Sequence, residues 1–169
     1  MIKKLLTLLC LLFLISCGSA SKTVKNTKQS STSSTSSTEK EPTLADKVVW
    51  TAVSYKGIPY RFGGLNEDGM DCSGLVYVSF KKRDIDLPRS SRLMYTKGYP
   101  ISLNEVKRGD LLFFKTSNKN GSVNHVGLVT SVKRGDIHFI HSTTKKGVLV
   151  SSLRERYWKQ AFIKAKRVL

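Results

Sequence analysis

The strongest constraint on the fold is a change of hydrophobic pattern along the chain, with helical spacing first and strand-like runs later. Residues 44–56 repeat apolar side chains on one helical face, with Thr43 as the predicted N-cap and Gly57 as a stop. Two further helices are predicted at 72–82 and 89–97. Short apolar or alternating runs, typical of strands, follow at 110–115, 123–131, 136–142, 148–152 and 161–168. This order predicts an α+β domain, in which N-terminal helices pack on a C-terminal antiparallel sheet.

Cys72 is the candidate for chemistry. It follows a glycine-containing stretch, residues 57–71, that is predicted to be a loop, and it opens an apolar segment. In the first turn of a helix, the dipole and the free N–H groups favour an anion, so we expect a lowered thiol pKa and a nucleophilic thiolate. The alternative is a buried cysteine that acts only as a small hydrophobic side chain.

The N-terminus has the pattern of an export signal. Lys3 and Lys4 precede an apolar run over 5–15 that is shorter than the roughly 20 residues needed to span a bilayer. The run ends in Ser-Cys-Gly, which is similar to a bacterial lipobox. We therefore predict a signal peptide at 1–16, with Cys17 as the lipidated first residue of the mature chain; an ordinary signal peptide with an incidental cysteine is the alternative.

Residues 17–42 are predicted to form a disordered tether, because this Ser/Thr-rich stretch has few apolar side chains to bury. The domain that follows, 43–169, is long enough for one compact core. After loss of Cys10 and acylation of Cys17, Cys72 has no cysteine partner, which is unusual in an exported protein.

The chain is strongly basic, with a formal net charge of +17. A basic surface suits an anionic partner, and a cell-wall polymer or anionic lipid fits an exported protein better than nucleic acid does. A solvated basic face without a specific partner is the other interpretation. We expect no nucleic-acid partner and a monomer.

A thiolate nucleophile needs a base, and the chain has three histidines. His125 begins a predicted strand, while His138 and His141 lie three apart in another, so only one of these two faces a given cleft. A zinc site from Cys72, His125 and His141 is disfavoured, because paired C-x-x-C or H-E-x-x-H spacing is absent. No cofactor or metal is expected.

Six short motifs follow one another along the domain: YRFGG at 60–64, DCSGLV at 71–76, LPRSS at 87–91, RGDLLFF at 108–114, NHVG at 124–127 and FIHS at 139–142. In this order they resemble the NlpC-type family of papain-like, cell-wall cysteine endopeptidases. The resemblance covers essentially all of 43–169, and the end of the chain is similar to single-domain lipoprotein murein endopeptidases.

The resemblance implies a role for each matching residue. Cys72 would be the nucleophile, His125 the general base, and His141 the polar residue that orients the base. Tyr60 would line the cleft and help to stabilise the oxyanion. The segment between His125 and His141 looks longer than the family's short hairpin, which keeps His138 in contention for the orienting role.

Two residues beside the nucleophile match substrate-contacting positions of the family. Asp71 and Ser73 would contact charged groups of the stem peptide, although Asp71 also suits a helix N-cap.

The implied function is hydrolysis of an amide bond in peptidoglycan stem peptides or cross-links, by an exported lipoprotein of the cell envelope. In a Gram-negative organism it would lie on the outer membrane and face the periplasm. Amidase or acyltransferase action on the same fold, or a non-catalytic wall-binding lipoprotein, are the alternatives. Both D-Glu–diaminopimelate and D-Ala–diaminopimelate bonds remain open as targets.

Overall fold

The computed structural model describes residues 41–117 and 123–169, all of which belong to the unit Glu39–Leu169. The predicted signal peptide, Cys17 and nearly all of the predicted tether lie outside the described residues. Within the described ranges, no helix is long and apolar enough to cross a membrane.

The N-terminal half is helical, as predicted. Helix α1, Leu44–Ser54, begins with a capping box in which Thr43 and Asp46 each accept from the other's backbone N–H. Helix α2, Cys72–Lys81, follows, and α3, Ser91–Met94, is a single turn. Helix α3 is therefore shorter than the predicted 89–97.

The segment 57–71 is not simply a loop, because it holds a small hairpin of β1, Leu65–Asn66, and β2, Gly69–Met70. A two-residue strand is too short to show an alternating pattern in the sequence.

A six-stranded sheet forms the second half, with the order β3-β8-β4-β5-β6-β7 and antiparallel pairing throughout. All five predicted strands are present, and β3 and the short helices η1 and α4 are additional. The bounds are β3 Tyr99–Ile101, η1 Leu103–Glu105, β4 Leu111–Phe114, β5 His125–Lys133, β6 Asp136–Thr143, β7 Gly147–Ser152, α4 Arg156–Ala161 and β8 Phe162–Arg167. The predicted α+β class is confirmed.

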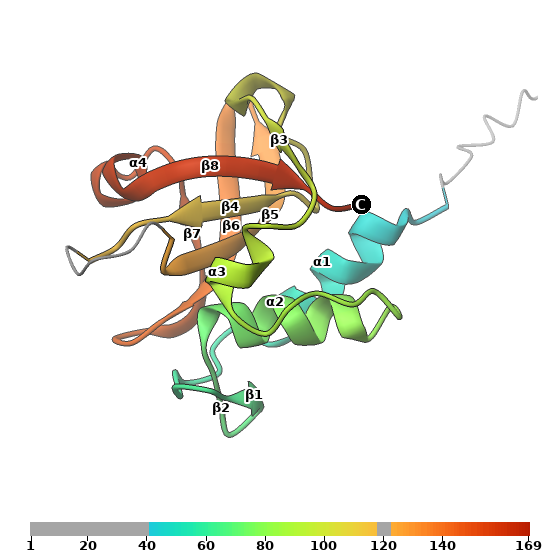
Figure 1. Ribbon diagram of the computed structural model, residues 1–169, viewed down its shortest axis with the longest axis vertical. Helices are drawn as coiled ribbons and strands as arrows, with labels where there is room; N and C mark the ends of the chain where they lie inside the picture. Colours follow the sequence, from blue (N-terminus) through green and yellow to red (C-terminus); the bar gives the residue numbers. More distant parts are fainter. Residues whose placement is uncertain (1–40, 118–122) are drawn as a thin grey trace, which may run out of the picture. The chain divides into compact units, whose positions relative to one another are not determined.

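Both faces of the sheet are covered, so its central strands are apolar on both sides. On β4, Leu111 and Phe113 face the core shared with α1 and α2, whereas Leu112 and Phe114 face a second core that includes Trp158 of α4. Figure 1 shows α1, α2 and α3 on one side of the sheet and α4 at the start of β8. Because α2 packs directly on β5 and β6, the start of α2 is fixed against these two strands.

The β5–β6 connection is a tight turn rather than a long loop. Arg134 and Gly135 both have positive φ, 50° and 73°, and Lys133 pairs with Asp136, as in a two-residue hairpin. The extra length lies in the strands themselves, and the register shifts between Val129 and Ser131.

Candidate active site

Cys72 is the first residue of α2, and Asp71 caps that helix. One carboxylate oxygen of Asp71, Oδ1, accepts from the backbone N–H of Gly74 at 2.6 Å and from the Ser73 hydroxyl at 3.1 Å. The other, Oδ2, accepts from the N–H of Gly63 at 2.9 Å. These bonds tie the loop before the cysteine to the helix that carries it.

Arg89 forms an ion pair with the capping carboxylate of Asp71. Its guanidinium donates to Oδ1 and Oδ2 of Asp71 at 2.9 and 2.8 Å, and also to Ser73 Oγ at 3.0 Å. Burial alone would raise the pKa of Asp71, but the hydrogen bonds from Arg89 and Gly74 outweigh it and hold that pKa below its ordinary value. Asp71 and Ser73 therefore serve the local structure and do not line the pocket; their contact with substrate stays a prediction.

The pKa of the Cys72 thiol is raised, not lowered as the sequence predicts. Burial raises its pKa to about 11, although the backbone N–H groups of Val126 and Ser73 oppose the shift. The predicted lowering is wrong, because desolvation of the sulfur outweighs the N-terminal amides of α2. The thiol is therefore protonated at neutral pH in the absence of substrate.

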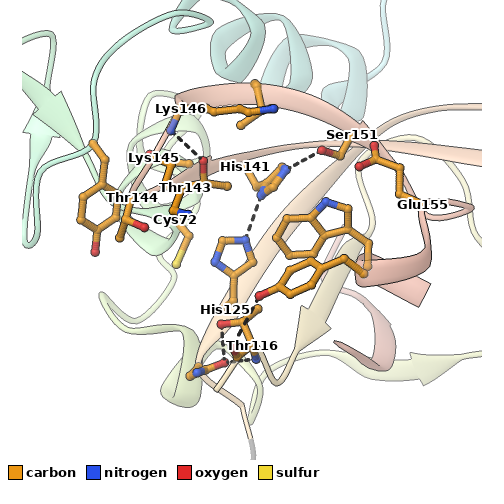
Figure 2. A pocket seen from close by; sticks show the side chains of 16 residues that line it. Cys72, Thr116, His125, His141, Thr143, Thr144, Lys145, Lys146, Ser151 and Glu155 are labelled. Carbon is orange, nitrogen blue, oxygen red and sulfur yellow. Dashed lines mark hydrogen bonds between the residues drawn. The ribbon is translucent and has the colours of Figure 1, made fainter. Parts of the chain in front are cut away.

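Strand pairing brings two histidines together. His125 is the first residue of β5 and His141 lies on β6, where Leu128 pairs with Ile140, so the two rings are diagonal neighbours on one face. The Nε2 of His125 lies 2.9 Å from the Nδ1 of His141, and Figure 2 shows the Cys72 sulfur pointing toward the His125 ring. Among the described residues, the Nδ1 of His125 has no hydrogen-bond partner.

His138 takes no part in this group. It is half-buried on the opposite face of β6, where its Nε2 lies 3.6 Å from Asp136 Oδ2. The structure thus brings His141, and not His138, to His125.

The two histidines lie in an aromatic enclosure. The ring of Trp158 stacks on His125 with centroids 5.3 Å apart and meets His141 edge-on at 4.5 Å. Phe139 packs against His141 at 4.7 Å. Burial lowers the pKa of His125 to about 4, and burial together with the charge of His125 lowers that of His141. Both rings are neutral at pH 7.

These side chains meet at a cleft of about 560 Å³ that is lined by Cys72, His125, His141 and Tyr60. Burial raises the pKa of Tyr60, and the nearby Cys72 and Asp71 add to this, so its phenol keeps its proton. The other residues that line the cleft are Thr116, Asn124, Ser142, Thr143, Thr144, Lys145, Lys146, Leu149, Ser151, Glu155, Tyr157 and Trp158.

Sequence reasoning gave no individual role to Arg89, Ser151 or Trp158. All three lie in strings that carry the family resemblance, Arg89 in LPRSS and the other two in the closing part of the chain, but no spacing indicated a role for any of them. Among residues 41–117 and 123–169, no three His, Cys, Asp or Glu side chains are grouped as metal ligands.

The NlpC/P60 family matches residues 57–167, well over half of the chain. This chain belongs to the NlpC/P60 family. It is 43% identical over 117 residues to the probable endopeptidase NlpC of Escherichia coli K12, covering 68% of this chain and 72% of that protein.

Two further relatives match a smaller share of their own length. The E. coli K12 protein named murein DD-endopeptidase MepS/murein LD-carboxypeptidase is 33% identical over 116 residues, which cover 68% of this chain and 58% of that protein. The crystal structure of an NlpC/P60 family protein from Bacillus cereus has a TM-score of 0.67 at 29% identity, covering 76% of this chain and 41% of that one. The chain thus spans less than two thirds of these two proteins.

Proposed function

We propose that this chain is a cysteine endopeptidase that hydrolyses an amide bond of peptidoglycan stem peptides or cross-links. The observation that carries the proposal is the hydrogen-bonded pair His125–His141 in the same cleft as Cys72. A thiol, an imidazole and a group that orients the imidazole are the parts needed for acyl transfer through a thioester. The names of the E. coli relatives support an endopeptidase of murein.

The first half of the reaction forms the acyl-enzyme. The Sγ–H proton of Cys72 passes to Nδ1 of His125 as the sulfur attacks the carbonyl carbon of the substrate. The tetrahedral oxyanion accepts hydrogen bonds from backbone N–H groups at the start of α2 and from the Tyr60 hydroxyl. His125 then gives its proton to the leaving amine, and the C–N bond breaks.

The second half returns the enzyme to its starting state. Water gives a proton to His125 while its oxygen attacks the thioester carbon. The C–S bond breaks, the product leaves with a new carboxyl group, and the proton on His125 returns to the sulfur of Cys72. Because the imidazole moves both protons, its loss should be costly, whereas His141 acts by holding its orientation.

The test uses the purified full chain on purified muropeptides, with products identified by mass spectrometry. Cys72→Ala should reduce hydrolysis to a trace, and His125→Ala should lower the rate by about a hundredfold or more. His141→Ala should also lower it strongly, and His141→Gln should retain part of the rate. The product masses also show which bond is cut.

His138→Ala is the matched control, because His138 lies on the same strand as His141 but faces away from it. It should leave the rate near wild type, with folding of every variant checked by circular dichroism. A folded Cys72→Ala protein that still hydrolyses muropeptides would remove the thiol from the mechanism. An inactive His138→Ala beside an active His141→Ala would reverse their roles.

The proposal includes the lipoprotein organisation expected from the sequence: signal peptide 1–16, acylated Cys17, tether 17–42 and catalytic domain 43–169. More than one acyl chain would anchor the domain stably to a membrane of the cell envelope, within reach of the wall. Cys17→Ala should then move the protein to the soluble fraction without loss of hydrolysis. Fractionation of this variant with membranes after a high-salt wash would contradict an acyl anchor.

A further inference from the structure

Ser151 contacts His141 on the side of the ring that faces away from His125. It lies on β7 with only 6% of its surface exposed, and its Oγ is 3.0 Å from the Nε2 of His141. The other nitrogen of that ring contacts His125, so a line of hydrogen bonds runs from β7 through β6 to β5 (Figure 2). Register explains the alignment: Phe139 pairs with Ser151 and His141 with Leu149, so the hydroxyl is diagonal to the His141 ring.

Only one direction of this line allows His125 to act as a base. If Ser151 accepts the Nε2–H of His141, then Nδ1 of His141 accepts the Nε2–H of His125, and Nδ1 of His125 keeps a free lone pair. If Ser151 donates instead, every hydrogen bond reverses, and Nδ1 of His125 already carries a proton. That form cannot take the proton of Cys72.

We propose that Ser151 is a positioning residue that accepts the Nε2 hydrogen of His141 and so holds His125 in the tautomer whose Nδ1 is open to Cys72. When His125 becomes doubly protonated, its Nε2–H still requires an acceptor at His141. That acceptor exists only while the hydrogen of His141 remains on the side of Ser151. The hydroxyl therefore supports both the resting state and the protonated state of the base.

Water is a poor substitute for Ser151 at this position. His141 is fully buried, and Trp158 and Phe139 pack against its ring. A buried imidazole N–H without a partner is unfavourable, so the identity of the group at residue 151 decides which nitrogen of His141 carries the hydrogen. The titratable groups that share the cleft with the pair are Tyr60, Cys72, Lys145, Lys146, Glu155 and Tyr157.

The tautomer can be measured without substrate, in the full chain labelled with ¹⁵N-histidine. The sequence has only three histidines, and a His138→Ala spectrum identifies the one outside the site. At pH 7 we expect His141 and His125 each to show a protonated Nε2 and an unprotonated Nδ1. The opposite assignment, with Nδ1 protonated in His141, would overturn the proposal.

Variants of Ser151 test the consequence for catalysis, which rests on the proposed function. Ser151→Ala should lower kcat about tenfold with little change in KM, and should replace the single His141 tautomer by a mixture. Ser151→Thr keeps the hydroxyl and suits a strand, so it should restore both the tautomer and most of kcat. Ser79→Ala is the control, because the hydroxyl of that buried serine donates to the Leu75 carbonyl within α2, away from the histidine pair.

An unchanged kcat and an unchanged His141 tautomer in folded Ser151→Ala would overturn the proposal. The ¹⁵N spectra of wild type and Ser151→Thr decide the tautomer even if the alanine variant does not fold. They also stand if the chain proves not to cleave muropeptides, so failure of this inference and failure of the proposed function are separate results.

Discussion

At the scale of single residues, burial keeps both the thiol and its partner imidazole neutral. The pKa of Cys72 is raised to about 11 and that of His125 is lowered to about 4. Between these limits the resting pair is thiol and imidazole, so charge separates only as the proton moves during attack. The site is thus arranged around a free base rather than around a standing thiolate.

The pH profile of kcat/KM tests this arrangement. His125 must be unprotonated to accept the proton of Cys72, so activity falls as pH drops through the pKa of His125. Because that pKa is lowered, the acid limb should have its midpoint below 6.5, toward pH 4. His138→Ala should give a superimposable acid limb, and a midpoint at or above 6.5 would contradict the lowered pKa.

The sequence could predict the position of Cys72 at a helix start, because a glycine-rich stretch meets an apolar segment there. It could not predict the thiol pKa, since that depends on how deeply the folded chain buries the sulfur. The interaction of Ser151 with His141 was equally hidden, because it follows from the β6–β7 register and not from any spacing along the chain.

At the scale of elements, the start of α2 depends on one ion pair. Asp71 is buried and joins the helix N-terminus to the preceding loop, and Arg89 supplies the compensating charge from the segment before α3. At the same junction, the backbone of Gly64 lies close to Gly74 of α2. A Cβ on Gly74 would be only 2.2 Å from the Gly64 carbonyl oxygen, so a glycine is needed there. The nucleophile is thus placed by three segments at once.

Arg89→Ala should therefore destabilise the fold by about 2 kcal/mol, because it leaves the Asp71 carboxylate buried without its guanidinium. Asp71→Asn keeps an oxygen for the Gly74 N–H and should cost less than Asp71→Ala. Chemical denaturation measures these changes. The control is Asp86→Ala at the exposed Lys81–Asp86 pair, which should change stability by less than about 0.5 kcal/mol; equal effects at both sites would contradict the assignment.

Long elements were predictable and short ones were not. The helices α1 and α2 begin at the predicted residues, since their caps and apolar spacing are visible in the sequence. Strand β3 was missed because Pro100 lies in its middle, which is tolerated at this edge of the sheet, where β3 pairs only with β8. The six residues of α4 are too few to show a helical period.

At the scale of the whole molecule, the neutral histidines make stability depend on pH. The unfolded chain protonates His125 near pH 6.5, whereas the folded protein does so only near pH 4. The pKa of His125 is lower in the folded protein than in the unfolded chain. The contribution of neutral His125 to the free energy of unfolding is therefore complete above pH 6.5 and is lost as pH falls. For His125 alone the loss should reach about 3 kcal/mol by pH 4.

Urea denaturation at pH 7 and at pH 5 measures this dependence. Wild type should be less stable at pH 5, and His125→Gln should show a smaller decrease because it removes one of the buried bases. His138→Ala should retain the wild-type decrease. Equal stability of wild type at the two pH values would show that His125 is not held neutral by the fold.

The sheet order has a consequence for how the enzyme comes into being. Strand β8, the last in the sequence, is inserted between β3 and β4, and β4 in turn pairs with the strand that begins at His125. Strands so far apart in the sequence pair slowly, because the intervening chain must first be brought together. Synthesis that stops short of β8 leaves the edge of β4 open and the sheet that carries both histidines unsupported. Removal of β8 therefore takes a pairing partner from both β3 and β4, and with it the support of the strand that carries His125.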